Sequence, residues 1–130
     1  MPELKDLLQS ADWKQEKHSP VIEVQGRAAA GEPITVSLSV GKEIGHPNTS
    51  EHHICWIECY FLPEGEKFPY FLGRTSFDSH GASVQGPNTS TVFSEPRCTL
   101  VLQTDKPGTL LAKSYCNIHG LWASSAGLTL

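Results

Sequence analysis

Five side chains of the types that bind transition metals lie in predicted loops or at predicted strand ends. They are His18, His46, His52, Cys116 and His119. Two of the histidines are spaced as H-x5-H in "HPNTSEH", and the cysteine begins a C-x-x-H in "CNIH". Each motif alone is weak, because a surface histidine is usually solvated and a lone cysteine usually packs in a core. Their combination in one short chain favours a metal site built on loops.

The ligand types restrict the choice of metal. Imidazoles suit iron, copper, nickel and zinc, and a thiolate adds a soft donor. Structural zinc often uses closely spaced cysteine pairs, but Cys55 and Cys59 lie on a predicted strand. Blue copper uses a weak axial methionine, and the chain has only Met1. Four histidines and one thiolate suit five-coordinate iron with an open position. A cupredoxin-like electron-transfer protein and a zinc-stabilised structural module remain alternatives.

Length and charge exclude several other classes. The 130 residues suit a single domain spanning 1–130. The net charge of −4, without a basic run, argues against a nucleic-acid partner. No apolar stretch is long enough for a transmembrane helix, so no membrane partner is expected. The first residues, "MPELKDLLQSADWKQEKHSP", lack the apolar core of a signal peptide, and a cytoplasmic location with reduced cysteines is therefore expected.

The hydrophobic pattern predicts an all-β fold. Residues 3–13 are predicted to form a short helix, with leucines on one side. Residues 34–40, "ITVSLSV", alternate strictly and predict a half-buried strand. Residues 53–62, "HICWIECYFL", are apolar on both faces except for Glu58 and predict a central strand. Further short strands are predicted in "PYFLGR", "CTLVLQT" and "GTLLAKSYC". This spacing of strands and turns indicates an antiparallel β-sandwich of about seven strands.

Longer motifs carry a resemblance to a known family. "EKHSPVIE", "GKEIGHPNTSEHHICWI", "HGASVQGPNTS" and "SYCNIHGLW" resemble the superoxide reductases of the neelaredoxin type, the one-domain relatives of desulfoferrodoxin. The resemblance runs from about Trp13 to Trp122. It implies an immunoglobulin-like β-sandwich that holds one non-haem iron per chain. The chain lacks a cysteine pair near its start, so the second iron centre of the two-domain relatives is not expected.

The resemblance also implies a role for each motif residue. Four histidines would form the equatorial plane of the iron, the last through Nδ1 and the others through Nε2: His18, His46, His52 and His119. Cys116 would be the axial thiolate. Glu16 would occupy the sixth position in the oxidised state only, and Lys17 would be the cation that attracts superoxide. Backbone N–H groups of the "CNIHG" turn are expected to donate hydrogen bonds to the sulfur.

The activity implied is superoxide reductase, a one-electron reduction of superoxide to hydrogen peroxide that takes up two protons and protects against oxidative stress. The electron would come from rubredoxin or a similar small donor. Relatives of this type indicate a homo-oligomer, with a tetramer favoured.

Two residues depart from the family pattern. Gly45 stands where a proline is expected, and this would loosen the loop that carries His46. Ala82 stands where a glutamate is expected. The remaining candidates are interpreted as structural: His53, His80, Cys55, Cys59 and Cys98. Trp122 is placed near the site without an assigned role.

Overall fold

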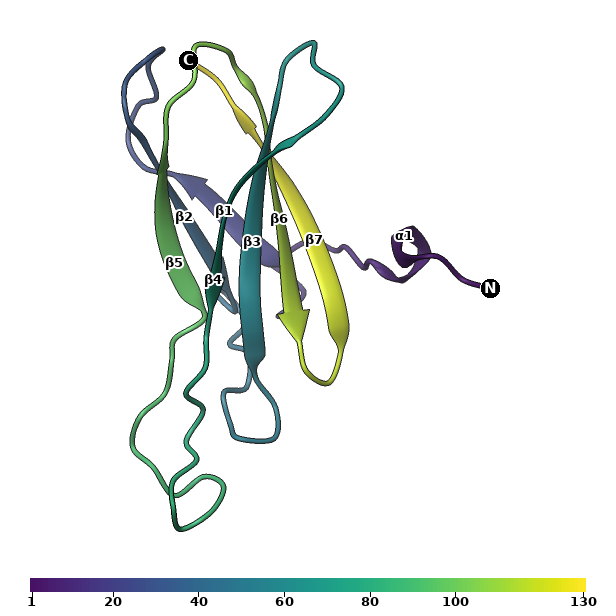
Figure 1. Cartoon of the computed structure of the whole chain (residues 1–130), viewed down its shortest axis with the longest axis vertical. Helices are drawn as coiled ribbons and strands as arrows, with labels where there is room; N and C mark the ends of the chain where they lie inside the picture. The colour runs from purple at the N-terminus through teal and green to yellow at the C-terminus, as the bar shows by residue number, and fades with distance from the viewer.

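Two antiparallel sheets form the body of the protein in a computed structural model that describes residues 1–130 (Figure 1). The elements are α1 (Leu4–Leu7), β1 (Pro20–Val24), β2 (Ile34–Val40), β3 (Ile54–Pro63), β4 (Tyr70–Ser76), β5 (Arg97–Leu102), β6 (Gly108–Cys116) and β7 (Gly120–Leu128). One sheet has the order β1-β2-β5 and the other β4-β3-β6-β7. The predicted immunoglobulin-like sandwich of about seven strands is confirmed, and β3 is a central strand.

The core lies between the sheets and follows the alternation of the strands. In β2, Ile34, Val36, Leu38 and Val40 are buried, while the intervening residues face outward. The opposite sheet contributes a second set of buried residues, among them Ile57, Cys59, Phe61, Leu110 and Ala112. Period-2 burial of this kind is what fixes strand register, because a slip of one residue would expose the whole apolar face.

A β-bulge interrupts β3 close to its start. The pairing with β6 shifts register between Ile54 and Trp56, so that Cys55 is the extra residue. Ile54 and Ile57 are consequently both buried although they are three residues apart. Bulges are frequent beside functional sites because they re-aim the neighbouring side chains. Here the bulge follows His52 and His53, and Ile54 pairs with Cys116.

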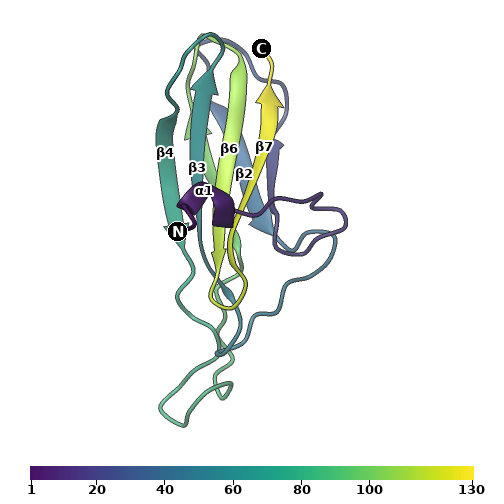
Figure 2. The same cartoon turned by 90° about the vertical axis from the view of Figure 1, so that its right-hand side faces the viewer.

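The N-terminal helix is shorter than predicted. Helix α1 covers only Leu4–Leu7, whereas residues 3–13 were expected to be helical. Its leucines are exposed, and the helix stands away from the sheets, to the right of β7 in Figure 1 and in front of the sheet in Figure 2. A single turn without a packed face is below the length at which helices are stable alone. The chain instead turns extended at Gln9, which forms an isolated parallel bridge with Trp122 of β7.

Three connections meet at one end of the sandwich, the lower end in Figure 1. They are residues 41–53 before β3, residues 77–96 between β4 and β5, and the short turn 117–119 between β6 and β7. Gly41 has a φ of +88°, and a side chain there would approach the backbone nitrogen of His46 to 2.7 Å. Glycine is therefore needed where the 41–53 connection begins. No helix has the length and apolarity required to cross a membrane.

Candidate metal centre

Four imidazoles form a closed ring at the end where these connections meet. Neighbouring ring centroids are 4.8 Å apart for His18–His46, 4.8 Å for His46–His52, 5.0 Å for His52–His119 and 4.7 Å for His18–His119. Most of these contacts are edge-on, so the rings do not stack on one another. Around the ring, His18 comes from the segment before β1, His46 and His52 from the 41–53 connection, and His119 from the β6–β7 turn. The structure thus brings together all four histidines that the sequence had singled out.

Cys116 completes the cluster from the last residue of β6. Its sulfur and one ring nitrogen each of His18, His52 and His119 all lie within 4.8 Å of one another. Cys116 is fully buried, and the backbone N–H of His119 donates to its Sγ at 3.4 Å. The expectation that the "CNIHG" turn donates to the sulfur is confirmed. All four cysteines are free thiols.

Hydrogen bonds on the outer nitrogens orient two of the imidazoles. Nδ1 of His18 donates to Oε1 of Glu16 at 2.6 Å, and Nδ1 of His46 donates to the carbonyl of Pro47 at 2.7 Å. Each bond places the proton on Nδ1 and leaves Nε2 as a lone-pair donor. Burial lowers the pKa of His46 to about 4, and burial also lowers the pKa of His52. Both rings are therefore neutral at pH 7, the form that binds metal.

The inward-facing nitrogens fit a bound cation. Nε2 of His46 and Nε2 of His52 are buried without any hydrogen-bond partner. Nε2 of His18 and Nδ1 of His119 approach to 3.1 Å, a distance that two lone pairs tolerate only with a proton or cation between them. Buried polar nitrogens without partners are costly. A metal ligated by these imidazoles would remove that cost.

Glu16 and Lys17 flank the cluster on the chain that leads into β1. The Glu16 carboxylate accepts hydrogen bonds from the backbone N–H and the ring of His18. Burial alone would raise the pKa of Glu16, but these bonds from His18 lower it below its usual value. The positive charge of Lys17 adds to burial in lowering the pKa of His46 and His52. Glu16 thus contacts a candidate ligand, and the Lys17 ammonium acts on the cluster through its field.

The two remaining histidines form a pair outside the cluster. The rings of His53 and His80 stack with centroids 3.5 Å apart and 2° between their planes. His80 is buried, and its nitrogens contact the side-chain oxygen of Asn48 at 2.7 Å and the carbonyl of Phe77 at 2.5 Å. Both residues thus lie outside the ring of four imidazoles and make contacts of a structural kind. Their stack joins the 41–53 connection to the 77–96 connection.

Trp122 packs directly against the cluster. Its indole stacks on the His18 ring at 5.0 Å and 13°, and its Nε1 donates to the carbonyl of His119 at 3.2 Å. The same carbonyl accepts from the Gln9 side chain at 2.8 Å. The sequence placed Trp122 nearby but gave no sign of Gln9. No spacing rule points to Gln9, because its partner lies 110 positions away in the chain.

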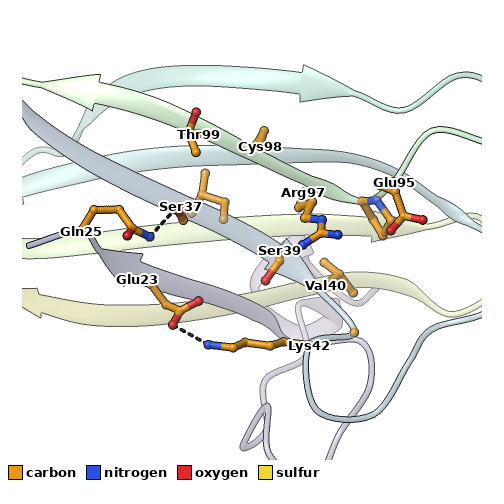
Figure 3. Close-up of a pocket in the computed structure, with 13 residues that line it drawn as sticks. Glu23, Gln25, Ser37, Ser39, Val40, Lys42, Glu95, Arg97, Cys98 and Thr99 are labelled. Carbon is orange, nitrogen blue, oxygen red and sulfur yellow. Dashed lines mark hydrogen bonds and ion pairs between the residues drawn. The ribbon is translucent and has the colours of Figure 1, made fainter.

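A surface groove lies elsewhere, on the outer face of the β1-β2-β5 sheet (Figure 3). The Lys42 ammonium pairs there with Glu23 at 2.5 Å, and Gln25 donates to Ser37 at 2.8 Å. None of the five candidate ligands lines it. The groove is mostly polar, and two of its charged side chains, Glu23 and Lys42, pair with one another.

Comparison with known proteins agrees with this geometry. The family model described as Desulfoferrodoxin matches residues 10–125. A superoxide reductase of Pyrococcus furiosus is 56% identical over 125 residues, which cover 96% of this chain and 98% of that protein. The neelaredoxin of Megalodesulfovibrio gigas is 51% identical over 125 residues, with 96% of each chain covered.

A solved structure gives the same result for the fold. The superoxide reductase (neelaredoxin) from Archaeoglobus fulgidus in the reduced form superposes with a TM-score of 0.89 at 60% identity, over 95% of this chain and 99% of that one. An immunoglobulin-like sandwich with four imidazoles and one thiol at one end defines the class as β-sandwich proteins with a histidine–cysteine cluster that fits a metal ion. Within that class, the chain belongs to the desulfoferrodoxin family.

Proposed function

We propose that this protein is a superoxide reductase. It takes one electron from a donor protein and two protons from solvent, and it converts one superoxide ion to hydrogen peroxide. The observation that carries the proposal is the closed ring of four imidazoles beside the buried Cys116 thiol. The relatives named superoxide reductase at 50–56% identity over nearly the whole chain support the same reaction.

The residues at this site fit a single iron ion. Nε2 of His18, His46 and His52, Nδ1 of His119 and Sγ of Cys116 would hold it. When bound, iron supplies a one-electron ferrous–ferric couple beside an open coordination position. The N–H of His119 that donates to Sγ disperses negative charge on the sulfur and stabilises its thiolate form. The Glu16 carboxylate fixes the ring plane of His18.

Lys17 is proposed to attract the anionic substrate. The chain carries a net charge of −4, so superoxide approaches a mildly repulsive protein. A cation close to the imidazole ring reverses that field locally and raises the encounter rate. Glu16 is proposed to be the sixth ligand of the oxidised state. Both hydrogen bonds from His18 are accepted by Oε1 of this carboxylate, so His18 does not engage Oε2.

The Lys17 proposal is tested by pulse radiolysis with the iron-loaded protein. We expect Lys17→Ala to lower the second-order rate constant with superoxide about tenfold and to flatten its dependence on salt. Lys14→Ala is the matched control, because it removes the same charge three residues earlier. A rate that stays at the parent value in Lys17→Ala would refute the steering role.

Metal analysis and visible spectroscopy test the reaction class. About one iron per chain, with a thiolate-to-iron band that bleaches on reduction, is expected. Stoichiometric copper with an intense blue band would instead indicate the cupredoxin-like alternative. No observation on this structure favours that alternative, since the single methionine, Met1, is fully exposed.

The proposal extends to the setting of the reaction. We propose a single domain over 1–130, a cytoplasmic location, rubredoxin or a similar small protein as the donor, and a homotetramer. The family resemblance supports these points.

Exposed aromatic side chains near β4, at Phe68, Tyr70 and Phe71, leave apolar surface for contact between copies. Light scattering coupled to size exclusion would measure the assembly.

A further inference from the structure

Asn117 joins the two segments that carry most of the candidate ligands. It lies in the β6–β7 turn, between Cys116 and His119. Its side-chain Oδ1 accepts from the backbone N–H of His53 at 2.9 Å, and its Nδ2 donates to the backbone carbonyl of Glu51 at 2.8 Å. Its own backbone N–H donates to the carbonyl of His53 at 3.2 Å. These three bonds reach across 64 to 66 positions of sequence.

The bonds hold the two peptide groups on either side of His52. Pairing between β3 and β6 ends at Ile54 and Cys116, one residue before Asn117. Beyond that point, the amide of Asn117 takes over the role of a backbone partner. An asparagine side chain suits this position because it offers one acceptor and one donor in a single plane. Aspartate keeps the acceptor but turns a second oxygen toward the Glu51 carbonyl.

The segment that Asn117 holds is already closed on itself. The backbone N–H of Thr49 donates to the carbonyl of His52 at 2.9 Å, and the N–H of His52 donates to Oγ1 of Thr49 at 3.0 Å. This turn fixes the shape of residues 49–52 but not their distance from the β6–β7 turn. Among the contacts of the flanking peptides, the Asn117 amide supplies the link to that turn.

We propose that Asn117 is a positioning residue of the metal centre. It holds the His52 imidazole close enough to Cys116 and His119 for all three to bind the same metal ion. The inference rests on the proposed metal site and adds a residue that does not itself touch the metal. Partners that orient ligands in this way typically change metal affinity 10- to 100-fold when they are altered.

Asn88, in the 77–96 connection, provides a control that contacts the same segment. Its Oδ1 accepts from the N–H of Ser50, and its Nδ2 donates to the Glu51 carboxylate at 2.8 Å. Asn88→Asp and Asn117→Asp each replace an amide that donates to an oxygen of Glu51 by a carboxylate. The difference is that Asn88 contacts the Glu51 side chain, whereas Asn117 contacts the peptides that flank His52.

The experiment measures Co²⁺ affinity of the metal-free full chain by competition with a chelator, and the thiolate-to-cobalt absorption band of the loaded protein. We expect Asn117→Asp to weaken Co²⁺ binding 10- to 100-fold and to shift or broaden the band. Asn88→Asp should stay within about threefold of the parent with an unchanged band. Urea midpoints of the metal-free variants show whether each one folds. Asn117→Ala, which removes both bonds without adding charge, replaces Asn117→Asp if the latter does not fold.

Two results overturn the inference. Parent-like affinity and band position in a folded Asn117 variant would refute positioning by this residue while leaving the metal centre intact. Equal losses in the Asn117 and Asn88 variants would show a general effect of destabilising the loop. A parent protein that shows no thiolate-to-cobalt band would refute the proposed metal centre itself, and the inference with it.

Discussion

Two segments that bring imidazoles to the same cluster are held in different ways. The connection that carries His46 and His52 is joined to distant parts of the chain by several side-chain hydrogen bonds. Asn48 donates to the carbonyl of Ser94, Ser50 donates to that of His80, and Asn117 bridges residues 51–53. Several independent bonds would have to break together before this connection could move.

The N-terminal segment that carries His18 has fewer anchors. Gln9 is attached to β7 through its backbone and to the His119 carbonyl through its side chain. The carbonyl of His18 accepts from the buried Ser114 hydroxyl at 3.2 Å, and its ring stacks on Trp122. Residues 11–15 between these anchors are mostly exposed. Segments with few buried contacts open at lower free energy than the core does.

The two parts of the cluster therefore differ in how firmly they are anchored. The 41–53 connection and the β6–β7 turn form a preorganised part of the site, because Asn117 hydrogen-bonds one to the other. The N-terminal segment closes the ring of imidazoles and also brings Glu16 and Lys17. The residues proposed to meet the substrate thus lie on the more easily displaced part of the site.

Trp122→Ala should have the largest effect, and it should act on the N-terminal segment rather than on the 41–53 connection. It removes the stacking surface of His18 and leaves a cavity, so we expect a loss of about 3 kcal/mol in the free energy of unfolding. Hydrogen exchange measured by mass spectrometry should increase in residues 9–18 and not in residues 46–53. Increased exchange of equal size in both segments would contradict their independence. Trp122→Phe, which keeps an aromatic ring, should recover much of the protection.

Thr49→Val tests the internal closure of the preorganised part. The hydroxyl that accepts from the N–H of His52 is lost while the side-chain volume is nearly kept. We expect a cost of about 1 kcal/mol in urea denaturation and faster exchange confined to residues 49–53. Thr49→Ser retains the hydroxyl and should behave as the parent does. Faster exchange in the N-terminal segment would show that the two parts are coupled.

Gly45→Pro should have the smallest effect, and in the opposite direction. Gly45 is exposed, its φ lies outside the left-handed region, and a side chain there would meet nothing within 4 Å. Restoring the proline of the family pattern should reduce the entropy of the unfolded chain and stabilise the protein by about 0.5 kcal/mol. Thermal melts of the metal-free protein measure this shift. A lower melting temperature would show that the native backbone at this position does not accept proline.

Strand periodicity predicted the centre of the fold better than its margins. Strict alternation identified β2, and the two-sided apolar run identified β3 as central. Strand β7, "GLWASSAGL", was not predicted individually, because glycine, alanine and serine have little intrinsic strand preference and its pairing with β6 decides its structure. The helix was overestimated, since no partner surface covers its leucines.

The candidate ligands could be found from residue type and loop position, but their supports could not. The Asn117 bridge, the Gln9 contact and the His53–His80 stack join residues that are 27 to 110 positions apart. Such contacts depend on the fold bringing distant loops to one end of the sandwich. Local spacing contains no information about them, whereas C-x-x-H and H-x5-H are visible within one turn or loop.

The burial of Cys59 affects how readily hydrogen peroxide can oxidise this thiol. Burial raises the pKa of this thiol to about 11, so on the order of one molecule in 10⁴ carries a thiolate at pH 7. Peroxide oxidises thiolates and spares thiols. A buried, protonated thiol such as Cys59 is therefore a poor target for the hydrogen peroxide that superoxide reduction releases.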